Sequence, residues 1–141
     1  MNNFEESLKE GYAKQIPTNS IRAKSLIKSS QEAINTAKEI PFLDGKLKSI
    51  FRELYEGFRE FCEALGYIKG YKFQSHEAIT HFLSEILKEQ KISTKFDRYR
   101  QLRNGINYYG NSISKETVTE ALEEIPKIIK ELEKFLPEQA P

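Results

Sequence analysis

The stretch Leu47-Lys-Ser-Ile50-Phe51-Arg-Glu-Leu54-Tyr55-Glu-Gly-Phe58-Arg-Glu-Phe61-Cys62-Glu-Ala-Leu65 decides the fold, because its apolar side chains recur every three or four residues. An α-helix has about 3.6 residues per turn, so this spacing gathers those side chains on one face. The face is wide enough to contact two neighbouring helices. We therefore expect the longest helix of the protein, opening near Asp44 and Gly45, to form the centre of the core.

The same periodicity recurs on both sides of this stretch and predicts an all-α fold with little room for strands. The helices that we expect cover about 4–15, from 19 or 20 to just before Pro41, 75–87, 94–109 and 115–136. Ser75 and Ser114 are predicted to cap two of them, and Thr94 with Asp97 resembles a capping box. Pro126 predicts a kink in the last helix. The prediction is an antiparallel up-and-down bundle of four to five main helices plus a short N-terminal helix, in a single domain covering 1–141.

Composition limits the function classes. The chain has 141 residues, with 22 basic against 21 acidic side chains, so any nucleic-acid binding must depend on a local patch of charge. Its one cysteine, Cys62, cannot form an internal disulfide, and its apolar neighbours predict a small core residue. The start of the chain is neither basic nor apolar, and no apolar run is long enough to span a membrane. We expect a cytoplasmic protein without a membrane anchor.

The most informative polar residues lie in Phe96-Asp-Arg-Tyr-Arg-Gln-Leu-Arg103-Asn104-Gly-Ile-Asn107-Tyr108-Tyr109-Gly110. An Arg-Asn pair within an amphipathic helix is suited to binding phosphate or shaping a site. The alternative is an arginine at a helix end followed by an Asn-Gly turn. Apolar residues keep helical spacing across Gly105, whose presence costs only about 1 kcal/mol relative to alanine, and this favours a continuous helix.

Two local patterns together resemble the HEPN family. Ser75-His76-Glu77-Ala78 opens a helix after an aromatic, basic loop, and Arg103-Asn104 follows one helix later. The resemblance extends from about Ser20 to Leu136 in the order and length of the helices. It implies a homodimer in which arginine, polar and histidine groups surround one cleft. Active members of the family cut RNA without a metal, and the branch that this chain resembles is paired with minimal nucleotidyltransferases in toxin-antitoxin systems.

This chain departs from the family motif where the histidine is expected. Arg103 and Asn104 match the first two positions, but the histidine position falls on Tyr108, or on Tyr109 or Gly110 with one or two more intervening residues. The tyrosine that a partner modifies in related toxins also falls on Gly110. An ordinary tyrosine, with a pKa of about 10, is protonated at neutral pH and is a poor general base. The motif therefore favours binding over cleavage, with His76 as a residue that can replace the missing base if it approaches Arg103.

Positive charge and tyrosines are concentrated between Lys91 and Tyr109. Five basic residues and one acidic residue lie between Lys91 and Arg103, a local charge of +4. Cations hold phosphates and aromatic rings stack on bases, so this composition suits single-stranded RNA. The candidate binding residues are Arg98, Tyr99, Arg100, Asn107 and Tyr109. One alternative is that the basic residues form a solvated helix face and the tyrosines belong to the core. Another is that the basic segment pairs with an acidic surface, either within the fold or across a dimer. The acidic residues that can supply such a surface are Glu116, Glu120, Glu123 and Glu124.

The sequence predicts no metal and no cofactor. His76 and His81 are five residues apart, which places them about 140° apart around a helix rather than on one face. We expect His76 to be a first-turn or core-edge residue and His81 to be partly exposed. No phosphate-binding glycine loop, nucleophile elbow or spaced cysteine set is present in the sequence.

Three function hypotheses follow. The first is a HEPN-like homodimer that binds or regulates RNA or a nucleotidyltransferase partner, with a degenerate catalytic motif. The second is a metal-independent endoribonuclease toxin that uses Arg103, Asn104 and either Tyr108 or His76. The third is a purely structural or interaction bundle.

Overall fold

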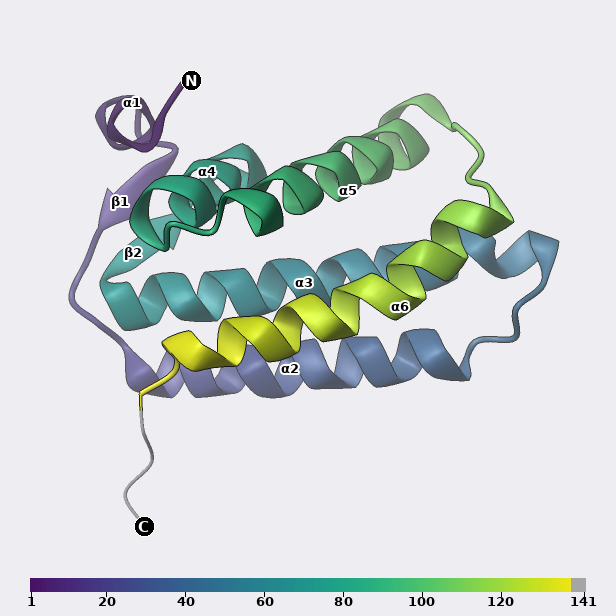
Figure 1. Cartoon of the computed structure of the whole chain (residues 1–141). Helices are drawn as coiled ribbons and strands as arrows, with labels where there is room; N and C mark the ends of the chain where they lie inside the picture. The colour runs from purple at the N-terminus through teal and green to yellow at the C-terminus, as the bar shows by residue number, and fades with distance from the viewer. Residues whose placement is uncertain (138–141) are drawn as a thin grey trace, which may run out of the picture.

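The computed structural model describes residues 1–137 and consists mostly of helices. Four long helices, α2 (Ser20–Glu39), α3 (Leu47–Lys69), α5 (Gln90–Tyr109) and α6 (Lys115–Leu132), run alongside one another (Figure 1). The chain reverses between α2 and α3 and again between α5 and α6. The prediction of an all-α bundle is confirmed.

The bundle is centred on α3, as its apolar pattern predicts. Its stripe is buried against α2, α5 and α6, with Phe51, Leu54 and Phe58 completely inaccessible. Cys62 is also buried, which confirms it as a core residue. Asn19, predicted as one of two possible starts of α2, caps it with a side-chain oxygen that accepts from the backbone N–H of Arg22.

The shorter elements lie at one end of the bundle and include features that the periodicity missed. They are α1 (Phe4–Lys9), β1 (Ala13–Gln15), β2 (Tyr71–Phe73) and α4 (His76–His81), followed by a π-helical turn over Phe82–Ile86. The first helix was predicted to reach Gln15, but it ends at Lys9. Gly11 then adopts a left-handed φ of +82°, and β1 pairs antiparallel with β2, placing Ala13 opposite Phe73. Local helical spacing cannot detect such pairing, because the partner strand is distant in sequence.

Of the three caps predicted at Ser75, Thr94 and Ser114, two agree with the structure and one does not. The hydroxyl of Ser75 accepts from the N–H of Glu77, and that of Ser114 accepts from the N–H of Thr117, so both caps are confirmed. The capping box at Thr94 is wrong, since α5 begins at Gln90. Thr94 lies one turn inside α5 and donates its hydroxyl to the carbonyl of Gln90.

The Arg-Asn pair lies on a continuous helix. Because α5 extends through Gly105 to Tyr109, the alternative of an Asn-Gly turn is wrong. A Cβ on Gly105 would come within 2.8 Å of the Asn111 amide nitrogen, so the glycine makes room for the segment that follows the helix. Gly110 ends α5 with a left-handed φ of +65°, and its N–H donates to the carbonyl of Gly105.

The last helix is continuous through Pro126, and a single turn of 3-10 helix over Glu133–Phe135 follows α6 before Pro137. The kink expected at Pro126 stays a prediction. In the described part of the chain, no helix combines the length and the apolar character needed to cross a membrane.

Candidate functional site

A shallow depression of about 360 Å³ lies where the start of α4 meets the second half of α5. It is lined by Ser75, His76, Glu77, Arg100, Arg103, Asn104 and Tyr108. The fold thus brings His76 to the same surface as the Arg-Asn pair, although the two lie far apart in sequence. The three residues that the sequence nominated for chemistry, Arg103, Asn104 and Tyr108, also share this surface.

Arg103 is half-buried and held in place mainly by an aromatic ring. Its guanidinium carbon lies 5.7 Å from the centroid of the Tyr55 ring, a distance at which the cation is attracted to the ring face. Its Nη1 lies 3.5 Å from the side-chain oxygen of Asn104. Within residues 1–137, no carboxylate forms an ion pair with Arg103. The guanidinium therefore keeps most of its donors for a ligand.

Tyr55 also contacts His76, and this contact determines the role of the imidazole. The Tyr55 hydroxyl lies 2.9 Å from His76 Nδ1. Burial raises the pKa of Tyr55 well above its usual value, so its hydroxyl remains protonated at neutral pH. The tautomer of His76 decides which of the two groups donates. Because Nδ1 is the only partner of this hydroxyl among the described residues, we assign the tautomer in which the hydroxyl donates to Nδ1 and the ring proton of neutral His76 lies on Nε2.

His76 is neutral at physiological pH. Burial, and then the positive charges of Arg59 and Arg103, lower its pKa to about 4. A neutral imidazole whose Nδ1 is occupied presents an N–H donor from Nε2, and such a donor can bind an anion. His76 is a poor general base for two reasons. Its pKa lies far below neutrality, and in this tautomer the nitrogen that does not contact Tyr55 already carries the proton.

The remaining nearby cations are matched with carboxylates. Arg59 on α3 forms ion pairs with Glu56 and Glu63. Burial disfavours the charged form of Arg59, but its hydrogen bond with Glu56 and the charge of Glu63 outweigh that effect and raise its pKa. Arg100 donates to Asp97 at 2.8 Å. Arg103 is consequently the cation of this depression with the most binding capacity left.

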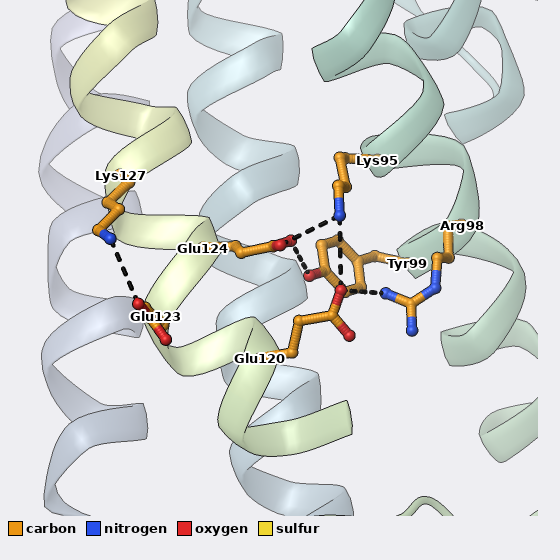
Figure 2. Close-up of polar contacts among 7 residues, drawn as sticks. All are labelled: Lys95, Arg98, Tyr99, Glu120, Glu123, Glu124 and Lys127. Atoms are coloured by element: carbon orange, nitrogen blue, oxygen red, sulfur yellow. Dashed lines mark hydrogen bonds and ion pairs between the residues drawn. The ribbon is translucent and has the colours of Figure 1, made fainter. Parts of the chain in front are cut away.

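The basic segment predicted from sequence divides between two sides of α5. Lys95 and Arg98 point toward α6, where Lys95 binds Glu120 and Glu124 and Arg98 binds Glu120 at 3.0 Å (Figure 2). Glu120 and Glu124 of the acidic face of α6 therefore pair with α5 within the fold, which was one of the two arrangements left open. Arg98 remains exposed, but its charge is partly neutralised, and it lies outside the depression that contains Arg103.

Tyr99 does not lie on the surface. Its ring is completely buried, and its hydroxyl donates to a Glu124 oxygen at 2.8 Å (Figure 2). A buried ring cannot stack on a base, so the nomination of Tyr99 as a binding residue is corrected: it is a core residue with one polar contact to α6. Helical spacing placed Tyr99 among apolar residues, and this signal pointed to burial.

The other tyrosines that the sequence nominated are on the surface. Tyr108 is 71% exposed and Tyr109 is 80% exposed. Asn107 is also exposed, and its side-chain oxygen accepts from Arg52 Nε at 2.8 Å. Sequence reasoning missed both Tyr55 and Arg52, because Tyr55 belongs to the apolar stripe of α3 and Arg52 carries no motif.

The two histidines have separate surroundings. His81 Nδ1 lies 3.6 Å from a Glu85 oxygen, whereas His76 is bound to Tyr55. Both are half-buried, as predicted. Across residues 1–137, no cluster of three or more His, Cys, Asp or Glu side chains is arranged to hold a metal ion.

Fold and site together define the chain as an all-α bundle with an arginine-containing surface depression. Comparison with protein-family models and with curated proteins gave no match. The HEPN resemblance thus rests on the sequence patterns alone and stays a prediction.

Proposed function

We propose that this protein binds single-stranded RNA through the depression around Arg103 and does not cleave it. The observation that carries the proposal is the state of Arg103: half-buried, fixed over the Tyr55 ring and without a carboxylate partner among the described residues. A cation positioned in this way has already lost much of the conformational freedom that binding would otherwise remove.

The chemistry of the depression suits a phosphodiester. The planar guanidinium of Arg103 can donate two parallel hydrogen bonds to phosphate oxygens. His76 Nε2–H adds a neutral donor, and the Asn104 amide both donates and accepts, as a ribose hydroxyl requires. Tyr108, exposed at the edge of the same depression, provides a ring on which a base can stack.

Cleavage is disfavoured by the same groups. A metal-independent ribonuclease needs a base to take the proton of the attacking 2′-hydroxyl, and a well-placed base contributes roughly 10²–10⁴ in rate. Neither candidate fits this role. Tyr108 is a tyrosine, and His76 has a pKa of about 4 with its Nδ1 bound to Tyr55.

A metal-independent endoribonuclease is the second candidate, favoured by the position of His76 in one depression with Arg103 and Asn104. It requires the other tautomer of His76, in which Nδ1–H donates to the Tyr55 oxygen and Nε2 is free to accept a proton. Arg103 would then bind the phosphate and the negative charge of the transition state, and Asn104 would orient it.

The homodimer and the nucleotidyltransferase partner are implied by the HEPN resemblance and are carried here as proposals. The exposed Tyr109 side chain, which does not line the depression, is an apolar surface on which either partner can pack. A purely structural bundle remains the third hypothesis, and it predicts that replacing Arg103 changes stability without changing any binding.

The test is fluorescence anisotropy of a labelled single-stranded RNA in excess chelator, with a gel to detect cleavage. Arg103→Gln should weaken binding about 10- to 100-fold, since a hydrogen bond to a charged group is worth about 1.5–3 kcal/mol. Arg22→Gln is the matched control, because Arg22 is an exposed arginine on α2. Intact RNA that Arg103→Gln fails to bind supports the proposal. Cleavage that Arg103→Gln abolishes would establish the second candidate instead.

A further inference from the structure

The exposed edge between α3 and α5 continues from the Arg103 depression toward the end of the bundle. The two helices run in opposite directions, as three contacts between them demonstrate. Tyr55 lies under Arg103, Arg52 Nε donates to Asn107 at 2.8 Å, and Lys48 Nζ donates to the Gly110 carbonyl at 3.4 Å. On α3, positions 48, 52 and 55 are four and three residues apart, so they share one face.

The cations along this edge are not equivalent. Lys48, Arg52 and Arg103 form no ion pair with any carboxylate of residues 1–137. Arg52 uses Nε for Asn107, and neither of its terminal nitrogens has a hydrogen-bond partner among the described residues. We refer to these three residues as the cationic track. It carries positive charge that the fold itself does not neutralise.

Carboxylates are gathered at the opposite end of the edge. Glu56 and Glu63 neutralise Arg59, Asp97 neutralises Arg100, and Glu77 lines the depression. A polyanion bound at Arg103 is therefore repelled beyond α4 and attracted toward Lys48. Before the start of α3, Asp44 is paired with Lys115, whose Nζ lies 3.2 Å from its oxygen.

We propose that the RNA strand runs along the cationic track, with one phosphate at Arg103 and the following phosphates at Arg52 and Lys48. This proposal rests on the proposed function and adds the path and length of the ligand. Four residues of helix advance about 6 Å, so Arg52 and Lys48 offer one cation for each extended nucleotide step. Tyr108, which is exposed and lines the depression with Arg103, provides a stacking surface at the start of the track.

Stacking distinguishes this ligand from other polyanions. An acidic peptide matches the charges but has no base to place on the exposed ring of Tyr108. A duplex keeps its bases stacked internally and hides their faces. An unpaired strand uses both the cations and the ring.

The test compares labelled hexauridylate RNA with labelled uridine monophosphate at several salt concentrations. Each phosphate contact in a single strand contributes about −0.7 to the slope of log K against log salt. The wild type should give a hexamer slope of about −2, and Arg52→Gln or Lys48→Gln should each reduce it by about 0.7 while weakening the hexamer three- to tenfold. Both variants should affect the hexamer more than the monophosphate, and Arg103→Gln should weaken both ligands.

Arg22→Gln and Lys24→Gln are the charge-matched controls on α2, and circular dichroism melts verify that each variant is folded. Hexamer binding that depends on Arg103 but is unaffected by Arg52→Gln and Lys48→Gln would overturn the cationic track and leave the proposed function intact. No binding of either ligand by the wild type would overturn both. The predicted loss of slope in the two track variants, absent from both controls, supports the track.

Discussion

Tyr55 and His76 illustrate how one hydrogen bond determines the chemistry of a site. A histidine near an arginine suggests a catalytic pair, but a base needs a free nitrogen of suitable pKa. Here the buried hydroxyl of Tyr55 occupies Nδ1, and burial with two nearby arginines keeps the ring neutral. His76 is thereby a donor for an anion, which connects the Arg103 depression to binding.

The protonation state of His76 can be measured directly. In nitrogen-15 NMR spectra at pH 7, His76 should be neutral with its proton on Nε2, and its titration should have a midpoint near the pKa of about 4. Tyr55→Phe should allow the other tautomer to appear, since it removes the hydroxyl that holds Nδ1. A midpoint above 6, or a proton on Nδ1 in the wild type, would contradict this assignment.

The lowered pKa also predicts how stability depends on pH. Between about 4 and the ordinary value of 6.5, the unfolded chain binds a proton at His76 that the folded chain does not. The free energy of unfolding should therefore fall as the pH falls from 6.5 to 4. His76→Gln should show a shallower fall over this range in urea denaturation, because that side chain does not titrate. Equal slopes for both proteins would show that His76 is not responsible.

At the residue scale, the sequence identified the groups but not their neighbours. Arg103, Asn104 and Tyr108 were predicted together because they fall on the positions of the HEPN motif that the sequence resembles. His76 was named as a possible neighbour, yet its approach depends on how α4 packs on α3. Tyr55 was missed because an apolar stripe predicts burial, and it does not indicate which edge of the stripe carries a hydroxyl.

At the scale of the elements, the polar contacts of α6 differ in how much they contribute to stability. Those that join α6 to Lys95 and Tyr99 of α5 are partly buried, and one within α6 itself is exposed. Burial opposes the charged form of Glu124, but hydrogen bonds from Tyr99 and Lys95 outweigh it and lower the pKa of Glu124. The Glu123–Lys127 pair on the same helix is far more exposed, at 68% and 71% of the two side chains. Pairs exposed to this extent contribute little to stability.

Removing the Tyr99 hydroxyl should therefore destabilise the protein measurably. Tyr99→Phe keeps the buried ring but removes the hydrogen bond to a carboxylate, and we expect a loss of about 1–2 kcal/mol in the free energy of unfolding. Lys127→Gln is the comparison, and it should change stability by less than about 0.5 kcal/mol. Chemical denaturation at pH 7 measures both. If the two variants are equally stable, the Tyr99–Glu124 contact does not secure α5 to α6.

Close packing of α2 on α3 depends on Gly57. A Cβ there would lie 2.7 Å from Ile34 Cδ1 and 3.1 Å from the Ser30 carbonyl oxygen, so the Ile34 side chain would have to move and the Ser30 backbone to shift slightly. The Ser30 hydroxyl also donates to the Gly57 carbonyl at 2.6 Å, so the two backbones are held together. Helix propensity favours alanine at this position by about 1 kcal/mol, and overpacking opposes it by about 1–3 kcal/mol.

Gly57→Ala should accordingly destabilise the protein by up to about 2 kcal/mol, despite the better helix propensity of alanine. Ile34→Val removes the nearest methyl group, so the same substitution should be less harmful in that background. Gly45→Ala is the control, because no atom lies within 4 Å of its added Cβ. A more stable Gly57→Ala protein would show that the helices separate easily at this point.

Element prediction succeeded where the signal was local. The long helices follow from apolar spacing and from capping residues such as Ser75 and Ser114. The errors arose where a distant segment decides the outcome: β1 exists because β2 pairs with it. Thr94 has the composition of a cap, but α5 begins four residues earlier at Gln90.

On the scale of the whole molecule, near-neutral net charge conceals a division between the two sides of α5. Toward α6, the cations of α5 are paired with the acidic face of that helix (Figure 2). Toward α3 and α4, Arg103 keeps its donors available. A count of charges predicted a basic patch of +4, but the packing of two helices determines which charges remain available for a partner.

The most direct measurement is an RNA titration of nitrogen-15-labelled protein, following the Nε–H signals of individual arginines. Arg103 and Arg98 lie on the same helix and belong to opposite sides of it, so each serves as a control for the other. The account predicts that a short single-stranded RNA shifts the signal of Arg103 and leaves that of Arg98 nearly unchanged. A shift of Arg98 with Arg103 unaffected would contradict the claim that the depression around Arg103 is the binding site.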